Sequence, residues 1–440
     1  MNRLSRLAAR VTGFRRDERG GMTILALYVL GGALLVSAFA IDFAYLMSAR
    51  TQLQVAADSA AHAALYYRES HSPDSAKAKA VAIAAHDMPS ETYGSVLRPS
   101  DVQFGIWDYA TRTFTPNDHV SNAVRVRPSR AASTGNPVST YLFRLLNHKD
   151  WDIVTEAIFV TFQPPCMTEG FVAEGIVDIQ SNNGFSSGFC VHSNTYVSLN
   201  SNNTFEPGTV VSMPDLEQLD MPKSGFKTNE GLEVALRKGY YRMRVLRKLD
   251  AIYADLSSGW GRYVPDYITG MALIPLSGAN TFDETSFEQG RIHRISCGDN
   301  AKISIPGDTH LKDMVIIADC AVHFGQDVLL ENVVFFNTST GPKSFYSAKG
   351  MQLGIDDNCA EGGGAQLVTR GGVEVAANLR LFGGQIIAGE TIQFAANAEG
   401  IQGASLIAGG MIDGTSNMDM GFCGSGMEQN FTASYFRLAL

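Results

Sequence analysis

The chain has 440 residues, a formal net charge of −9 and only 18% charged side chains, with 43 glycines against 15 prolines. This length exceeds what a single small core needs, so two or more packed units are expected. The acidic balance argues against a surface that follows a phosphate backbone, because nucleic-acid affinity depends on clustered cations. We therefore expect no nucleic-acid partner.

The N-terminal residues 1–21 form a basic stub, and a long uncharged segment follows it. Met22 to Ile41 contain no charged residue, and a helix of this length at about 1.5 Å per residue spans a hydrocarbon core of about 30 Å. Arginines precede the segment and Asp42 follows it. The pattern predicts a transmembrane helix over 22–41 in a lipid bilayer, with a cytoplasmic N-terminus and the bulk of the chain outside the cytoplasm.

A cleaved signal peptide is the alternative interpretation of the same segment. Ala38-Phe39-Ala40 before Ile41 has the small-residue pattern of a signal-peptidase site. The apolar run is longer than a usual signal-peptide core of about 7–15 residues, and the helical pattern continues beyond the site. We therefore expect the segment to be retained.

Residues 42–70 continue without glycine or proline and are rich in alanine, which predicts one helix that extends out of the membrane. Ala56, Ala60 and Ala64 recur on one face, where small side chains permit close approach of another helix. That helix could belong to a partner or to the next domain of this chain.

A set of residues in this region carries a family resemblance, in order along the chain: Arg15, Arg16, Arg19, Gly20, Asp42, Arg50, Leu53, Gln54, Ala57 and Asp58. With the uncharged run between them, they resemble the N-terminal region of TadG-like proteins of the Flp/Tad pilus system. The resemblance implies a single-pass component of the bacterial inner membrane with a periplasmic or extracellular bulk, which works with other Tad/Flp pilus assembly proteins.

One feature of the pilin-type relatives is absent. Those relatives carry a glutamate five residues after the glycine at which a prepilin peptidase cuts, whereas Leu25 and Ala26 occupy the corresponding positions here. The difference favours a permanently anchored accessory protein over a polymerising pilin.

Residues 71–165 mix helical and strand patterns and predict a small α+β module, ending in a linker at Gln163-Pro164-Pro165. The expected elements are a helix at 73–87, strands at 102–108 and 123–127, a short helix at 138–146 and a strand at 151–162.

A repeat with a period of about twenty residues begins after Cys166. The segment from Val177 to Phe185 recurs from Val197 to Phe205, and the segment from Val373 recurs from Ile392. Ile387-Ala-Gly389 recurs in the same way at Ile407-Ala-Gly409. A period of this size suits one coil of a parallel β-helix, in which inward apolar side chains stack and Asn and Gly form the corners.

We therefore expect a mainly β protein in which 166–440 form a right-handed parallel β-helix. A helical insertion is expected at about 206–290, because Thr228 to Leu256 place apolar residues near helical spacing with interleaved cations. Those cations are interpreted as a solvated helix face.

All six cysteines lie beyond the apolar segment, which favours disulfides in an oxidising compartment over free buried thiols. They are Cys166, Cys190, Cys297, Cys320, Cys359 and Cys423. Cys166 and Cys190, and likewise Cys297 and Cys320, are separated by about one coil, and neighbouring coils are close enough for a disulfide. Elimination then pairs Cys359 with Cys423, whose glycine-rich flanks permit a loop conformation.

No catalytic, cofactor-binding or metal-binding residue is expected. Asp356-Asp357 faintly resemble the paired aspartates of polygalacturonase-type glycosidases, but the companion motifs of that family are absent, so a turn is the preferred interpretation. No histidine pair has the spacing of a common metal motif. We expect a non-enzymatic scaffold or presentation protein. The alternative is an anchored β-helix that binds or cleaves a surface polysaccharide.

Overall fold

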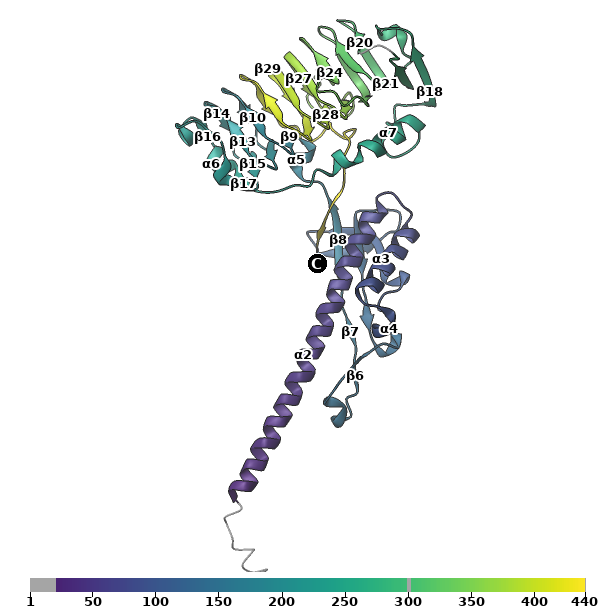
Figure 1. Ribbon diagram of the computed structural model, residues 1–440, viewed down its shortest axis with the longest axis vertical. Helices are drawn as coiled ribbons and strands as arrows, with labels where there is room; N and C mark the ends of the chain where they lie inside the picture. The colour runs from purple at the N-terminus through teal and green to yellow at the C-terminus, as the bar shows by residue number, and fades with distance from the viewer. Residues whose placement is uncertain (1–20, 299–301, 440) are drawn as a thin grey trace, which may run out of the picture. The chain divides into compact units, whose positions relative to one another are not determined.

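The computed structural model describes residues 21–298 and 302–439, which form two compact units (Figure 1). The first unit contains the chain up to Phe162 together with the C-terminal strand β33 (Tyr435–Leu438), and the second contains Gln163–Ser434. The second unit is therefore inserted between two strands of the first. We describe each unit by itself.

The first unit is built on one unbroken helix, α2 (Gly21–Arg68), drawn in purple in Figure 1. Its apolar N-terminal part is exposed in the chain itself, as Leu34 at 62% and Leu35 at 64% illustrate. From Ala49 onward one face is buried in the core of the unit. The expected continuous helix is confirmed, and its exposed apolar part is long enough to cross a membrane.

The alanine face of α2 packs on this chain's own next helix, α3 (Pro73–Asp87). Ala56, Ala60 and Ala64 are fully buried there, opposite alanines of α3. Because both faces carry small side chains, the two helices can approach closely. Of the two interpretations of this stripe, packing within the chain is the one observed.

An antiparallel sheet completes the first unit, with the strand order β2-β1-β3-β8-β33. Its strands are β1 (Val102–Asp108), β2 (Thr113–Pro116), β3 (Ala123–Val126), β8 (Ala157–Phe162) and β33. Short pairs flank it: β4 (Ser129–Arg130) with β7 (Ile153–Val154), and β5 (Val138–Ser139) with β6 (Asp150–Trp151). The helix α4 (Ser90–Tyr93) precedes the sheet.

The short helix expected at 138–146 is a wrong prediction. Val138 and Ser139 form a strand opposite Trp151 and Asp150, and only Phe143–Leu146 make a helical turn, the 3₁₀ helix η4. The β-branched Val138 and Thr140 have low helix propensity, and Trp151 offers a strand partner that local sequence does not reveal.

The second unit is a parallel β-helix, as predicted, and its described residues contribute 24 strands to one sheet. One face runs in the order β18-β19-β21-β23-β26-β28-β30-β9-β12-β15-β17, all parallel. The strands up to residue 238 are β9 (Gly170–Ala173), β10 (Val177–Ile179), β11 (Gly184–Phe185), β12 (Cys190–Ser193), β13 (Val197–Leu199), β14 (Asn203–Phe205), β15 (Val210–Met213), β16 (Asn229–Glu230) and β17 (Leu236–Lys238).

The remaining strands lie between residues 270 and 421. They are β18 (Gly270–Ser277), β19 (Arg291–Ser296), β20 (Lys302–Ile305), β21 (His310–Ala318), β22 (Ala321–Phe324), β23 (Leu329–Asn337), β24 (Phe345–Ser347), β25 (Gln352–Leu353), β26 (Ala365–Thr369), β27 (Val373–Phe382), β28 (Gln385–Ala388), β29 (Ile392–Gln402), β30 (Ser405–Ala408), β31 (Ile412–Gly414) and β32 (Asp419–Gly421). Inward apolar side chains of all coils form one continuous core.

The repeat observed in the sequence sets the register of neighbouring coils. Ile179 lies opposite Leu199, and Phe185 lies opposite Phe205 with stacked rings 4.7 Å apart. Ile387 lies opposite Ile407 in the second repeat. The offset of nineteen or twenty residues is thus one turn of the β-helix.

Asparagines occupy the corner of several coils. Asn182, Asn202 and Asn417 have positive φ angles of 62°, 65° and 63°, a left-handed conformation that asparagine tolerates better than most residues. Their side chains also bond from coil to coil, with Asn202 donating to Asn182 at 3.2 Å and Asn182 donating to Asn417 at 3.2 Å.

The order of coils in space differs from their order in the sequence. β9 lies between β12 and β30, so the first coil packs against the last one, and the teal and yellow coils are neighbours in Figure 1. Residues 239–269 connect the two ends of the stack, because β17 lies at one end and β18 at the other.

The amphipathic helix expected at 228–256 is also corrected. The segment contains α6 (Leu232–Ala235), strand β17, the 3₁₀ helix η7 (Arg244–Lys248) and α7 (Leu249–Ser258). Strand β17 pairs with Val211–Met213 and extends the stack, so tertiary pairing overrides the local helical spacing. The insertion at 206–290 is therefore only partly helical.

The β-helix also ends earlier than expected. Residues 435–438 pair with β8 in the first unit, because Tyr435 lies opposite Phe162. A strand at the chain end carries no repeat signal, so its partner could not be identified from the sequence.

Candidate functional site

The site begins at Asp42, a residue of the family motif that directly follows the apolar segment of α2. Its side chain is 1% exposed, and its carboxylate accepts hydrogen bonds from the backbone N–H groups of Tyr141 at 2.9 Å, Leu142 at 2.9 Å and Phe143 at 2.6 Å. We call residues 141–143 and Asp42 together the Asp42 clamp. It fixes the loop between β5 and β6 against the helix.

The carboxylate is held in its charged form. Burial acts to raise the pKa of Asp42, but the three backbone hydrogen bonds outweigh burial and leave the pKa below its ordinary value. A carboxylate that accepts several backbone N–H bonds is strongly favoured over the neutral acid. The clamp is therefore closed at neutral pH.

Aromatic rings surround the clamp. Phe39 lies edge-on to Phe143 at 5.6 Å, Tyr45 lies edge-on to Tyr141 at 4.9 Å, and Phe143 contacts Trp151 at 5.5 Å. Tyr and Trp concentrate where a membrane protein crosses the interface between lipid and water. These rings, which we call the aromatic collar, lie beside the end of the apolar segment of α2, where such an interface would be expected.

The other described residues of the family motif build the junction of α2 with its module. Leu53 and Ala57 are fully buried in the core. The Gln54 side chain donates to Asp58 at 2.9 Å and to the backbone oxygen of Glu156 at 3.0 Å, while Arg50 is exposed. Arg15, Arg16, Arg19 and Gly20 lie outside the described residues.

Sequence reasoning identified Asp42 but not the segment that it binds. Tyr141, Leu142 and Phe143 contribute backbone groups, which leave no trace in a sequence pattern. The aromatic residues Tyr141, Phe143 and Trp151 are a sequence signal that could have indicated the contact between this loop and α2.

The six cysteines form the three disulfides expected from coil spacing. Cys166 pairs with Cys190, Cys297 with Cys320 and Cys359 with Cys423, at Cα separations of 4.9, 6.1 and 5.7 Å. The first coil is also tied to the last, because buried Glu169 accepts backbone N–H groups of Cys423 and Gly424. Burial raises the pKa of the Glu169 carboxyl, against the effect of these two bonds.

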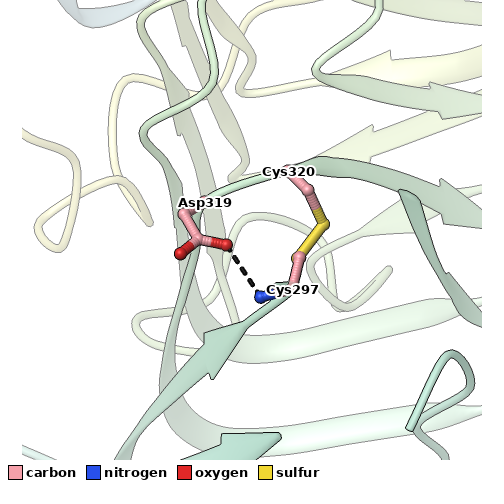
Figure 2. Close-up of side chains that lie close together, drawn as sticks. All are labelled: Cys297, Asp319 and Cys320. Carbon is pink, nitrogen blue, oxygen red and sulfur yellow. Dashed lines mark hydrogen bonds between the residues drawn. A yellow bond between two sulfur atoms is a disulfide. The ribbon is translucent and has the colours of Figure 1, made fainter. Parts of the chain in front are cut away.

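One cluster has the composition of a metal site but a different role. Cys297, Cys320 and Asp319 lie together, as Figure 2 shows. The two sulfurs are bonded to each other, and one carboxylate oxygen of Asp319 accepts the backbone N–H of Cys297 at 2.9 Å. Because thiolates are the ligands that soft metals require, the cluster in this form is a cross-link between coils.

The paired aspartates occupy a turn beside a disulfide. Asp356 is exposed, and Asp357 accepts the backbone N–H of Ala360 at 3.0 Å, one residue beyond Cys359. This arrangement uses Asp357 to order the turn.

Different family models match the N-terminal region and the β-helix unit. The Tad model, described as Flp pilus-assembly TadE/G-like, matches residues 20–82, and the Tad_C model, described as Tad-like Flp pilus assembly, matches 59–158. A domain of unknown function, DUF7867, matches 170–424. The comparisons with curated proteins and with solved structures found no similar protein. The N-terminal region is thus TadG-like, as its motif indicated, and these domains support a role in pilus assembly.

Proposed function

The chain belongs to the family of the DUF7867 domain, and we propose that it is a non-enzymatic, inner-membrane-anchored scaffold that presents a β-helix during Flp/Tad pilus assembly. The observation that carries this proposal is the continuity of α2. One helix leads from an exposed apolar segment, through the Asp42 clamp, into the core of a Tad-type module. Other pilus assembly proteins are the partners that such a module would contact.

Charge and redox chemistry support a cytoplasmic N-terminus in this proposal. Arginines precede the apolar segment, which favours a cytoplasmic N-terminus. Three disulfides follow it, and disulfides persist in the periplasm rather than in the cytoplasm. Both arguments support a periplasmic location for the module and the β-helix.

A presentation role is supported by the way the β-helix is held. Both of its connections come from β8 and β33, which are neighbouring strands of one sheet. Three disulfides and one continuous core make the β-helix a stiff body. A stiff domain that is joined to the module through two neighbouring strands is suited to displaying a surface or to acting as a spacer.

The test is to replace Leu34 and Leu35 by Arg in a piliated strain that produces this chain, and to compare it with the same strain after deletion of the chain. Each arginine should cost about 2.5–3.5 kcal/mol of insertion free energy, so the protein should leave the membrane fraction and surface pili should be lost. The matched control replaces both leucines by alanine. Recovery of the wild-type protein as a soluble form that begins at Ile41 would show a cleaved signal peptide, and normal piliation without the chain would remove the assembly role.

A further inference from the structure

A cleft on the β-helix unit is lined by two segments that the sequence did not single out. Residues 262–266 follow α7, and residues 428–432 precede the end of the unit. Together they enclose about 340 Å³, within the range of small-ligand sites. Arg262, Asp266 and Glu428 are exposed around it. We call it the 262/430 cleft.

The wall at 428–432 is held rigidly by the β-helix. Gln385 is fully buried and grips the backbone of Phe431 twice, accepting its N–H at 2.8 Å and donating to its oxygen at 3.1 Å. Gln366, at the matching position of the neighbouring coil, donates to the Asn430 side chain at 3.4 Å. The cleft is thus ordered before any ligand arrives, which lowers the entropy cost of binding.

Two amides in this wall lack the partners that buried polar groups normally have. The Asn430 side chain is 7% exposed, and its amide nitrogen has no hydrogen-bond partner among the described residues. The amide oxygen of Gln429 is also unpartnered within the described part of the chain. Because an unpaired buried amide is costly, a ligand that reached either amide from the cleft would be stabilised by the bond that it supplies.

The chemistry of the lining selects the ligand class. Carboxylates of Asp266 and Glu428 accept hydrogen bonds, Arg262 and the Asn430 amide donate, and sugar hydroxyls do both. Tyr263 and Phe431 meet edge-on at 5.6 Å and are largely buried, and the half-buried Val264 and Pro265 add apolar surface to the cleft for the C–H face of a ring. Two carboxylates against one guanidinium disfavour an anionic ligand.

We propose that the 262/430 cleft binds an uncharged sugar unit of a glycan chain. This activity is additional to the assembly role and does not depend on it. Cell-wall and surface glycans share this chemistry, so the probes below include both N-acetylated and plain sugars. A peptide also carries donors and acceptors, and it is included as a rival ligand.

The experiment measures binding to the purified full-length chain in detergent by calorimetry and saturation-transfer NMR. The probes are the trimer of N-acetylglucosamine, cellotriose, maltotriose, trigalacturonate as an anionic sugar of equal length, and trialanine. We expect one neutral trimer to bind saturably at millimolar or lower concentration, with trigalacturonate and trialanine at least about tenfold weaker. Preference for the N-acetylated trimer would indicate a cell-wall source, and preference for a plain trimer a surface polysaccharide.

Two variants assign the binding to the cleft. Asp266→Ala removes an exposed carboxylate and leaves the core intact, and Asn430→Leu removes the unpartnered amide. Each should weaken binding about tenfold, whereas the matched control Asp356→Ala, an exposed carboxylate elsewhere on the same unit, should bind as wild type. If Asn430→Leu does not fold, Asp266→Ala decides alone. Failure of every neutral trimer to saturate, equal binding of trigalacturonate or trialanine, or unchanged binding by Asp266→Ala would overturn the proposal.

Discussion

Val177 lies directly opposite Ile412, so the first coil of the β-helix is stacked on the last one. The same junction recurs on another face, where Gly170 pairs with Ser405. The two chain ends of the unit therefore meet inside the stack, and internal segments form the ends of the rod. Glu169, which precedes β9, accepts the backbone N–H groups of Cys423 and Gly424 and reinforces this junction. The disulfide Cys359–Cys423 ties the end of the last coil to the loop between β25 and β26.

The insertion predicts that the first unit folds without the β-helix. Because Phe162 and Tyr435 are paired, residues 163–434 can be replaced by a two-residue Asn-Gly turn that closes β8 and β33 as a hairpin. The shortened protein should remain in the membrane and resist limited proteolysis between 49 and 162. A control that ends the chain at Phe162 lacks β33 and should be less resistant. Equal resistance of both forms would show that β33 does not stabilise the unit.

The Asp42 clamp predicts an acid-sensitive loop. The pKa of Asp42 is lowered in the folded protein, so its contribution is present above the unfolded carboxyl pKa of about 4 and is lost as the pH falls through the folded pKa. Hydrogen exchange at Tyr141, Leu142 and Phe143 should therefore accelerate in strong acid relative to neighbouring amides. Asp42→Asn should show fast exchange at every pH.

The matched control for the clamp is Asp87→Asn, which changes an exposed carboxylate at the end of α3. It should leave exchange at residues 141–143 unchanged. Slow exchange in Asp42→Asn at neutral pH would mean that the aromatic collar, rather than the carboxylate, holds the loop.

Asp178 predicts the opposite pH dependence. Burial raises its pKa, and so does the carboxylate of Asp413, which lies directly opposite on the next coil. The contribution of Asp178 to folding stability is therefore fully present below the unfolded carboxyl pKa of about 4, and it is lost as the pH rises through the folded pKa. Asp178→Asn should stabilise the β-helix at pH 7 by about 0.2–1 kcal/mol, because like charges on facing residues repel.

Denaturant unfolding followed by near-UV circular dichroism at pH 7 and pH 3 measures this effect. The gain from Asp178→Asn should vanish at pH 3, and adding Asp413→Asn at pH 7 should bring little further gain, since the repulsion is already removed. Additive gains from the two substitutions would contradict the assigned coupling.

Asn202 and Asn203 are neighbours at one corner of the β-helix, but their substitution should lower the stability of the protein by very different amounts. Buried Asn203 accepts the backbone N–H of Asn183 at 2.9 Å and donates to the backbone oxygen of Asn200 at 3.0 Å. Asn203→Ala should therefore destabilise by about 1–3 kcal/mol for each unsatisfied buried group. At Asn202 the main requirement is a positive φ of 65°, so Asn202→Gly should change stability little. Thermal unfolding of the two variants side by side checks this, and similar melting temperatures would refute it.

Local sequence was sufficient wherever one segment carries its own signal. The uncharged run from Met22 to Ile41 and the alanines that follow predict helix α2, and Ser72 with Pro73 predicts the start of α3. The twenty-residue repeat predicts both the β-helix and its register, because each coil must place equivalent side chains inward. Coil spacing in turn predicts the disulfides, since cysteines one turn apart become neighbours.

Only the tertiary structure decided the features that depend on distant partners. The residues from Leu236 to Lys238 have helical spacing, yet they pair with β15 because the open end of the stack offers hydrogen bonds. Likewise Val138 becomes a strand residue because Trp151 lies opposite. The junction of Val177 with Ile412, the Asp42 clamp and the 262/430 cleft each join segments far apart in the chain. Backbone groups and chain crossings form these contacts, and neither produces a periodic pattern of side chains that a sequence could display.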